Sequence, residues 1–268
     1  MASHSNPKAL PPIVVTRPHA HAEELLEALR AMGLEARHHP LIDLQPFKDD
    51  GSTPAEAQQI RQLTLDIDRF RAVIAISQNA AECGLYWLDR YWPQFPIDID
   101  WYAVGPTTAY VLEDAGLAVQ QPLEQFDSEG VLALPGLQSD QIDGEKVLIW
   151  RGVGGRETLA TELRKRGAEV VYCELYRRDQ VDCSADDWQR TLAGKPLLLL
   201  SSGQALDIIE QQVGILSEQI SGIIVPSERV AEKARAAGYR KVMVAASARN
   251  EDTLHSLRQW LIADDVGF

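Results

Sequence analysis

Two stretches of this chain are copies of one another, and that duplication limits the folds open to it. The segment IVVTRPHAHAEELLEALRAMGLEARHHPLIDL, which starts at Ile13, aligns without a gap with VLIWRGVGGRETLATELRKRGAEVVYCELYRR, which starts at Val147. Both copies have a short apolar strand, a helix with apolar residues three to four positions apart, and a second strand. Gly33 aligns with Gly167, each where a helix C-cap needs a positive φ. Each copy is therefore predicted to form a β-α-β unit.

Later parts of the chain repeat as well. The apolar run AVIAIS, which ends at Ser77, corresponds to LLLLSS, which ends at Ser202. YAVGPTTAYVLEDAGL corresponds to IIVPSERVAEKARAAGY, and FDSEGVLALPGL corresponds loosely to ARNEDTLHSLRQWL. Strands that alternate with helices of this length predict a parallel sheet covered on both faces. We therefore expect an α/β protein of two similar lobes, each with a parallel sheet flanked by helices.

Composition excludes several classes of protein. The 268 residues carry a net charge of -13, which argues against nonspecific binding to nucleic acid. No apolar run reaches the roughly 20 residues that span a bilayer, and the first residues lack the apolar core of a signal peptide. Cys83, Cys173 and Cys183 form no CxxC pair, so neither a disulfide framework nor a zinc site is indicated. We expect a protein of the reducing cytoplasm.

Serines at two strand ends are the first candidate site residues. Ser77 and Ser202 each follow a buried strand at the point where a helix begins. In open α/β sheets ligands bind at the carboxyl ends of the strands, where free backbone N–H groups and a partial positive charge suit an anion. The alternative is that both serines are ordinary N-caps that serve local stability alone.

Two loops add further candidates. The loop GVGGRE follows a strand, but a dinucleotide fingerprint would need glycine where Glu157 stands, which disfavours a nicotinamide enzyme. Its amides can still surround a carboxylate, with Arg151 and Arg156 beside them; the alternative is a glycine-rich turn with solvated arginines. The loop VGPTTA offers Thr107 for a polar contact, and its counterpart VPSERVA places Arg229 there.

The motifs VVTRP, SQNA, AVGPTTA, FDSEGVLAL, RGVGGRETLATELRKRGAEV and ELYRR, in this order, resemble the uroporphyrinogen-III synthase family over about residues 13–261. The family often has Ser-Pro-Asn where this chain has Ser77-Gln78-Asn79. The resemblance implies two HemD-type lobes joined by a two-stranded linker. It places residues 12–40 and 181–261 in lobe 1, 47–172 in lobe 2, 41–46 and 173–180 in the linker, and 1–11 and 262–268 in flexible termini.

The resemblance also implies a reaction and a site. The family closes hydroxymethylbilane into uroporphyrinogen III, with loss of water, inversion of the last pyrrole ring, and no cofactor or metal, in the cleft between the lobes of a monomer. Tyr176 matches the family's tyrosine proposed as proton donor; it aligns with Ile42 in the first copy, and the alternative is a packing tyrosine. The predicted substrate-binding residues are Thr16, Arg17, Ser77, Gln78, Asn79, Gly105, Thr107, Ser128, Arg151, Gly155, Arg156, Ser202, Ser227 and Arg229.

A function of another class stays open at this point. Two similar lobes with a linker also suit a non-catalytic small-molecule binding protein or sensor. Turnover of hydroxymethylbilane distinguishes the two.

Overall fold

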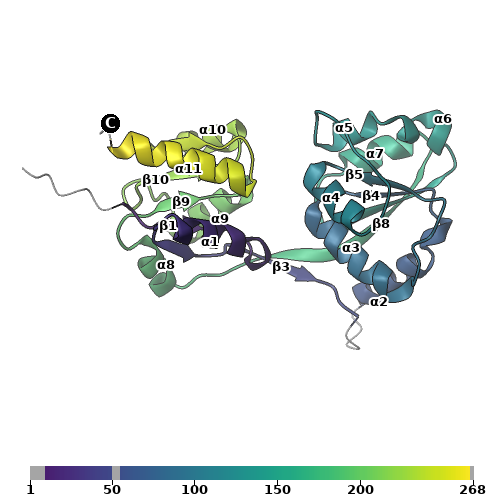
Figure 1. Cartoon of the computed structure of the whole chain (residues 1–268), viewed down its shortest axis with the longest axis horizontal. Coiled ribbons are helices and arrows are strands. Elements are labelled where there is room, and N and C mark those ends of the chain that lie inside the picture. Colours follow the sequence, from purple (N-terminus) through teal and green to yellow (C-terminus); the bar gives the residue numbers. More distant parts are fainter. Residues whose placement is uncertain (1–9, 50–54, 266–268) are drawn as a thin grey trace, which may run out of the picture. The chain divides into compact units, whose positions relative to one another are not determined.

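The computed structural model describes residues 10–49 and 55–265 of the chain, which divides into two compact units (Figure 1). Unit 1 takes the chain up to Leu44 and again from Asp179 onward, and unit 2 is Gln45–Arg178. Unit 1 is thus made of two separate segments of the chain, and the expected limits of the lobes and of the linker stay predictions. Of the termini expected to be flexible, 1–11 and 262–268, residues 1–9 and 266–268 lie outside the described residues.

Unit 1 is built on a five-stranded parallel sheet, here called sheet 1, in the order β11-β10-β9-β1-β2. Its strands are β1 (Ile13–Val15), β2 (Ala36–His38), β9 (Leu197–Leu199), β10 (Gly222–Val225) and β11 (Val242–Val244). The turn η1 (His19–His21) and α1 (Glu23–Ala31) follow β1, and the later helices are α8 (Ala185–Leu192), α9 (Gly203–Val213), α10 (Glu228–Ala236) and α11 (Asn250–Asp265).

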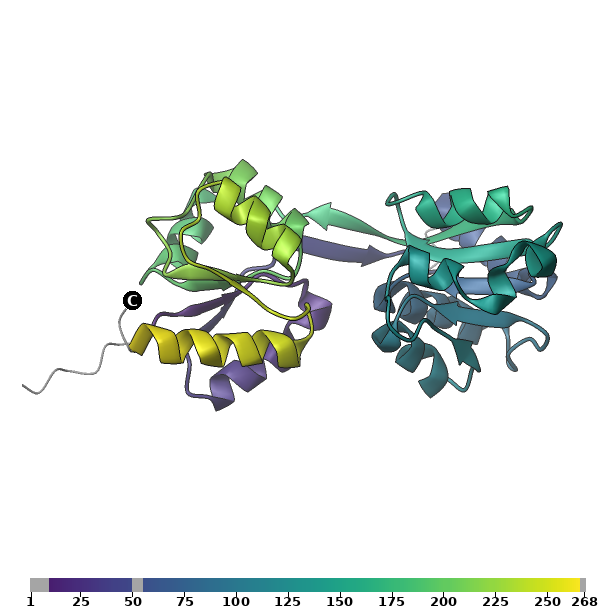
Figure 2. The ribbon, with the colours of Figure 1, turned by 90° about the horizontal axis from the view of Figure 1, so that it is seen from above.

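Alternating strand residues of sheet 1 point into two separate hydrophobic layers. Ile13 and Val15 pack with Leu25 of α1 and Leu257 of α11 on one face. Val14 packs with residues of α8, α9 and α10 on the other. Figure 2 shows α1 in purple and α11 in yellow together on one side of the sheet. Because both faces are covered, the central strands β1, β9 and β10 are buried along their whole length, whereas the edge strand β2 contains Arg37 and His38.

Unit 2 is built on sheet 2, a six-stranded sheet in the order β3-β8-β7-β4-β5-β6. Its strands are β3 (Ile42–Pro46), β4 (Ala72–Ala75), β5 (Asp100–Ala103), β6 (Val119–Gln120), β7 (Lys146–Gly152) and β8 (Glu169–Gln180). α5 (Ser128–Leu132), α6 (Ser139–Ile142) and α7 (Thr158–Lys165) pack in one hydrophobic layer. The other helical elements are α2 (Ala55–Leu65), η2 (Ile67–Arg69), α3 (Gln78–Tyr91), α4 (Pro106–Asp114) and η3 (Pro135–Leu137).

The register of the two sheets confirms the duplication. In sheet 1, Ile13 lies opposite Ala36 and Leu197. The sequence alignment equates these three residues with Val147, Val170 and Ala72, which pair with one another in sheet 2 in the same way. The predicted C-cap glycines are confirmed too, because Gly33 and Gly167 have φ values of +76° and +95°. The predicted fold class is therefore confirmed.

The strands β3 and β8 lie side by side and form the two-stranded linker (Figures 1 and 2). Phe47 N–H donates to Leu175 O and Val181 N–H donates to Leu41 O, both at 3.0 Å, so the two strands are antiparallel. Residues of β8 up to Tyr176 also pair with β7, and Cys173 and Tyr176 are buried.

Two further observations complete the fold. α11 extends to Asp265, and its buried residues Leu257 and Trp260 pack on sheet 1. Within residues 10–49 and 55–265, no helix is both long and apolar enough to cross a membrane.

Gly84 tests the close packing of α3 on sheet 2. A Cβ at this buried helix position would lie 2.2 Å from a ring carbon of Trp150 on β7. Gly84→Ala is therefore expected to lower the free energy of unfolding by about 1–3 kcal/mol through overpacking, although alanine is the better helix former.

Gly203→Ala is the matched control, because its new Cβ would meet only Val230 at 3.5 Å. Denaturant unfolding of both variants is the measurement. An equal or higher stability of Gly84→Ala would contradict this packing.

Candidate functional site at the carboxyl edges of the sheets

Both predicted serines are N-caps in the structure. Ser77 precedes α3 in an extended conformation, and its Oγ accepts a hydrogen bond from Ala80 N–H at 3.1 Å. Ser202 precedes α9 in the same way, and its Oγ accepts from Ala205 N–H at 3.2 Å. Neither helix has an acidic residue in its first turn. Both N-termini therefore keep the partial positive charge that favours an anion.

Only Ser77 has a second side-chain partner among the contacts of these two serines. Its Oγ lies 3.1 Å from the hydroxyl oxygen of Tyr176. Nη2 of Arg178 donates to that same tyrosine oxygen, also at 3.1 Å. Tyr176 is 1% exposed, whereas Ser77 is half-buried and Arg178 is exposed. The three side chains form a hydrogen-bonded cluster, here called the tyrosine cluster, at the carboxyl edge of sheet 2.

A β-bulge brings Tyr176 to this edge. Arg151 lies opposite Glu174, but the next residue, Gly152, lies opposite Tyr176, so Leu175 has no partner in β7. An extra residue of this kind bends a strand and redirects the side chain that follows. Gly152 is also necessary, because a Cβ there would lie 2.8 Å from the tyrosine ring. The tyrosine ring therefore rests on the backbone of β7.

Arg151 and Arg17, which align in the duplication, hold their own units together. Arg151 is 2% exposed; it pairs with Glu157 at 3.2 Å and donates to Gly154 O, with Tyr172 stacked 4.3 Å away. Arg17 is 8% exposed and donates to Asn250, to Thr253 and to a carbonyl before α11. Burial lowers the pKa of Arg17. These guanidinium groups already have partners, and their predicted contact with substrate stays a prediction.

In the loop between β7 and α7, a backbone N–H group that could bind a ligand is already hydrogen-bonded within the protein. Gly154 N–H donates to Glu174 Oε1 at 3.1 Å. The pKa of Glu157 lies below its usual range, chiefly because the Tyr172 hydroxyl donates to its carboxylate. Gly155 and Arg156 are exposed. The pKa of Asp127 is lowered mainly by hydrogen bonds from Gln125 and Gly130, and the charge of Arg156 makes a smaller contribution in the same direction. Arg156 is thus the exposed arginine of this loop.

The remaining helix starts differ in their caps. Gly105 and Ser227 occupy the N-cap positions of α4 and α10, and neither helix has a side-chain cap bond. Such a helix start has backbone N–H groups to offer a ligand. At α5 the N-cap is Asp127, which accepts from Gly130 N–H at 2.9 Å. Its carboxylate places a negative charge beside the predicted binding residue Ser128.

The structure places the other predicted residues as follows. Thr107 and Arg229 are exposed in the first turns of α4 and α10. Thr16 is buried and donates to Leu199 O at 2.9 Å. Gln78 donates to Glu82, and Asn79 is half-buried beside it.

Arg178 is the residue that the sequence analysis missed. The motif ELYRR could have indicated it, because Tyr176 and Arg178 are two positions apart in a strand and such residues share a face.

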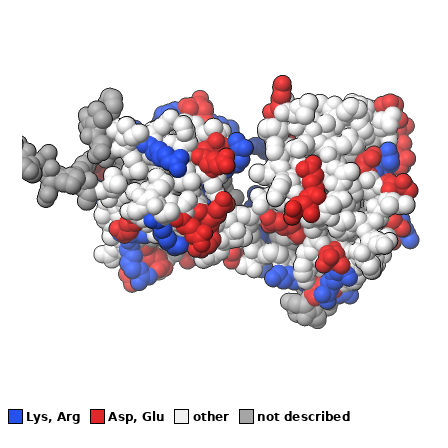
Figure 3. All heavy atoms as spheres, in the orientation of Figure 1, with Lys and Arg blue, Asp and Glu red and all other residues white. Residues whose placement is uncertain are grey.

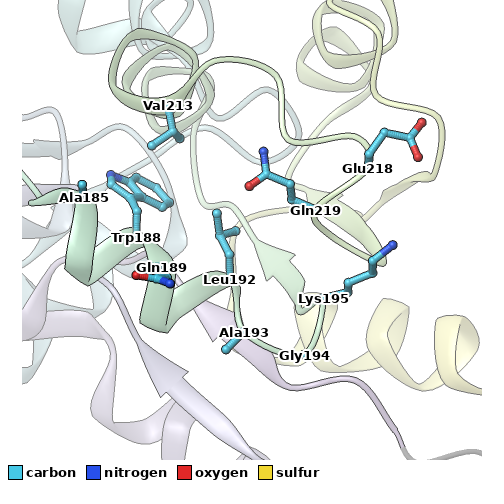
Figure 4. A pocket seen from close by; sticks show the side chains of 10 residues that line it. All are labelled: Ala185, Trp188, Gln189, Leu192, Ala193, Gly194, Lys195, Val213, Glu218 and Gln219. Carbon is cyan, nitrogen blue, oxygen red and sulfur yellow. The ribbon is translucent and has the colours of Figure 1, made fainter.

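A pocket of about 520 Å³ in unit 1 lies at the opposite edge of sheet 1 (Figure 4). Trp188, Leu192 and Val213 supply apolar walls, and Lys195 and Glu218 lie on the segments that lead into β9 and β10. The pocket is therefore at the amino ends of the strands, away from Ser202.

On the face drawn in Figure 3, acidic and basic side chains are interspersed without a continuous basic area.

Comparisons with known proteins give one consistent result. A family model described as uroporphyrinogen-III synthase HemD matches residues 23–255. Uroporphyrinogen-III synthase of Escherichia coli is 35% identical over 260 residues, which cover 92% of this chain and 99% of that protein. The Salmonella typhimurium protein of the same name is 34% identical over 257 residues, with the same coverage. The resemblance found in the sequence is confirmed.

Solved structures show the same fold. A mutant uroporphyrinogen III synthase of Thermus thermophilus has a TM-score of 0.62 at 13% identity and covers 95% of this chain and 100% of its own. Uroporphyrinogen-III synthetase of Helicobacter pylori has a TM-score of 0.58 at 16% identity, with coverages of 94% and 100%.

Replacing the two loop arginines separately tests their different environments. Arg151→Gln is expected to lower the free energy of unfolding by about 1–3 kcal/mol, because a buried hydrogen-bonded cation and its stacking on Tyr172 are lost. Arg156→Gln is expected to leave the melting temperature unchanged, since this side chain is exposed. Thermal unfolding of both variants is the measurement, and equal losses of stability would refute the assignment of Arg151 to the loop's framework.

Proposed function

This chain belongs to the uroporphyrinogen-III synthase HemD family, and we propose on that premise that it cyclises hydroxymethylbilane to uroporphyrinogen III, with loss of water and inversion of ring D. The observation that carries the proposal is the tyrosine cluster: a tyrosine hydroxyl at the carboxyl edge of sheet 2, beside the N-terminus of α3. In the first copy of the repeat, Ile42 stands at the position that aligns with Tyr176, so the shared fold does not require the tyrosine.

The reaction needs a proton at its first step. The C–O bond of the hydroxymethyl group breaks, the oxygen leaves as water, and a pyrrole-stabilised cation remains. We assign Tyr176 as the source of that proton, because a phenol carries its proton at neutral pH and does not require a buried charge beforehand. Ring closure releases a proton when the attacked pyrrole regains its aromaticity, and that proton restores the phenol. Protons therefore balance over one turnover.

The substrate's eight carboxylates need a site in a protein of net charge -13. We propose that the starts of α3, α4, α9 and α10 hold them, because backbone N–H groups supply hydrogen bonds without a net positive surface. Arg156 and Arg229, both exposed, add charge beside two of these loops. We expect the enzyme to act as a cytoplasmic monomer on this small molecule alone, with no nucleic acid or membrane involved.

Much of the catalytic task is control of the product. The cation closes spontaneously at the wrong carbon, so the isomer is selected when the protein holds the linear tetrapyrrole in a folded conformation. The test supplies enzymically made hydroxymethylbilane and measures the ratio of isomer III to isomer I. We expect isomer III to dominate with the protein and isomer I without it. The same ratio in both samples would contradict the proposal and favour a binding protein.

Tyr176→Phe tests the proposed proton source. Loss of the hydroxyl is expected to lower kcat by about 10²-fold, the low end for general-acid assistance, because this leaving group departs easily. The ring keeps its packing on Gly152, so stability should fall by only about 1 kcal/mol.

Tyr172→Phe is the matched control on the same strand, since its hydroxyl bonds Glu157 outside the tyrosine cluster. Turnover and melting temperature are measured for both. Equal kcat values for Tyr176→Phe and wild type would leave Tyr176 a packing residue.

A further inference from the structure

The hydrogen-bond donors around Tyr176 determine the direction in which its proton points. The guanidinium of Arg178 can only donate, so the tyrosine oxygen is an acceptor in that bond. The other close contact of the oxygen is Ser77 Oγ, at 3.1 Å, where either atom can be the donor. The phenolic proton of a side chain that is 1% exposed needs an acceptor, because an unsatisfied buried donor is costly. Ser77 Oγ is the acceptor that the described contacts provide.

Ser77 then has one proton that faces away from the tyrosine. Its Oγ accepts from Ala80 N–H at 3.1 Å and from the tyrosine hydroxyl, which occupies both lone pairs. Its own O–H is left to donate elsewhere. Ser77 is half-buried, whereas Tyr176 is fully buried. A substrate that approaches the cluster can therefore accept the Ser77 proton, but not the tyrosine proton. Arg178 thus donates to Tyr176, Tyr176 donates to Ser77, and Ser77 can donate to a bound substrate.

We propose that Ser77 is the catalytic residue that protonates the departing hydroxyl of the substrate and that Tyr176 supplies the proton through it. The inference rests on the proposed cyclisation. As the substrate C–O bond breaks, the Ser77 proton moves to the leaving oxygen to give water, and the Tyr176 proton moves to Ser77 Oγ. The phenolate that results lies 3.1 Å from the cationic Arg178, which favours its negative charge. The proton released at ring closure returns by the reverse path.

Burial excludes direct transfer from Tyr176 in this arrangement. One side of its ring faces the backbone of Gly152, and its oxygen is already bonded by Ser77 and Arg178. A substrate hydroxyl must come to about 2.6–3.2 Å of a proton donor. Ser77 offers that distance without displacement of either partner. Its place at the start of α3 also sets the leaving oxygen against a helix N-terminus.

Four variants separate the hydroxyl of Ser77 from its capping role. Glycine is a good N-cap without a hydroxyl, and threonine retains one. We expect Ser77→Gly and Ser77→Ala to lower kcat by about 10²-fold, as for Tyr176→Phe, and Ser77→Thr to restore most of it. Ser202→Ala loses the equivalent cap bond in unit 1, and we expect it to raise KM more than it lowers kcat, because Ile42 stands where the tyrosine would be.

The measurements are kcat and KM with hydroxymethylbilane, the isomer ratio, and the melting temperature of each variant. A low kcat for Ser77→Gly at a wild-type melting temperature, with recovery in Ser77→Thr, supports the relay. A wild-type kcat for a folded Ser77→Gly overturns it. If Ser77→Gly does not fold, a kcat of Ser77→Thr as low as that of Tyr176→Phe overturns it, and a near-wild-type value supports it. An inactive wild-type protein would instead refute the proposed cyclisation itself.

Discussion

The β-bulge at Leu175 is the constraint on which the candidate site depends. It leaves Leu175 without a partner in β7 and turns Tyr176 onto Gly152. The carbonyl of Leu175 accepts a hydrogen bond from Phe47 N–H, just beyond β3. Both residues belong to unit 2, and β8 lies between β7 and β3 in sheet 2. This bond therefore holds β8 on the side away from β7, next to the bulge that places the phenol.

Duplication produced two similar carboxyl edges, and their side chains have diverged. Ser77 and Ser202 cap equivalent helices. The residues aligned with Gly152, Tyr176 and Arg178 are Pro18, Ile42 and Leu44. Proline and two aliphatic side chains cannot form a hydrogen-bonded cluster. The edge of sheet 2 therefore has the tyrosine cluster, whereas the edge of sheet 1 keeps the cap of Ser202 without it.

Local patterns predicted much of this fold correctly. The alignment at Ile13 and Val147 reproduces the observed register, and Ser77, Ser202, Gly33 and Gly167 occupy the predicted caps, because strand ends and helix ends follow from nearby residues. The bulge could not be predicted, since it depends on which strands pair. For the same reason the burial of Arg17 and Arg151 could not be predicted, because it depends on tertiary contacts.

A double-mutant cycle on Ser77 and Tyr176 tests whether one proton passes through both hydroxyls. If one proton passes through both hydroxyls, removal of either breaks the same path. We expect the kcat of the double variant, Ser77→Gly with Tyr176→Phe, to equal that of each single variant, with melting temperatures that show all three proteins folded. Losses in kcat that multiply in the double variant would show two independent contributions and would contradict the relay.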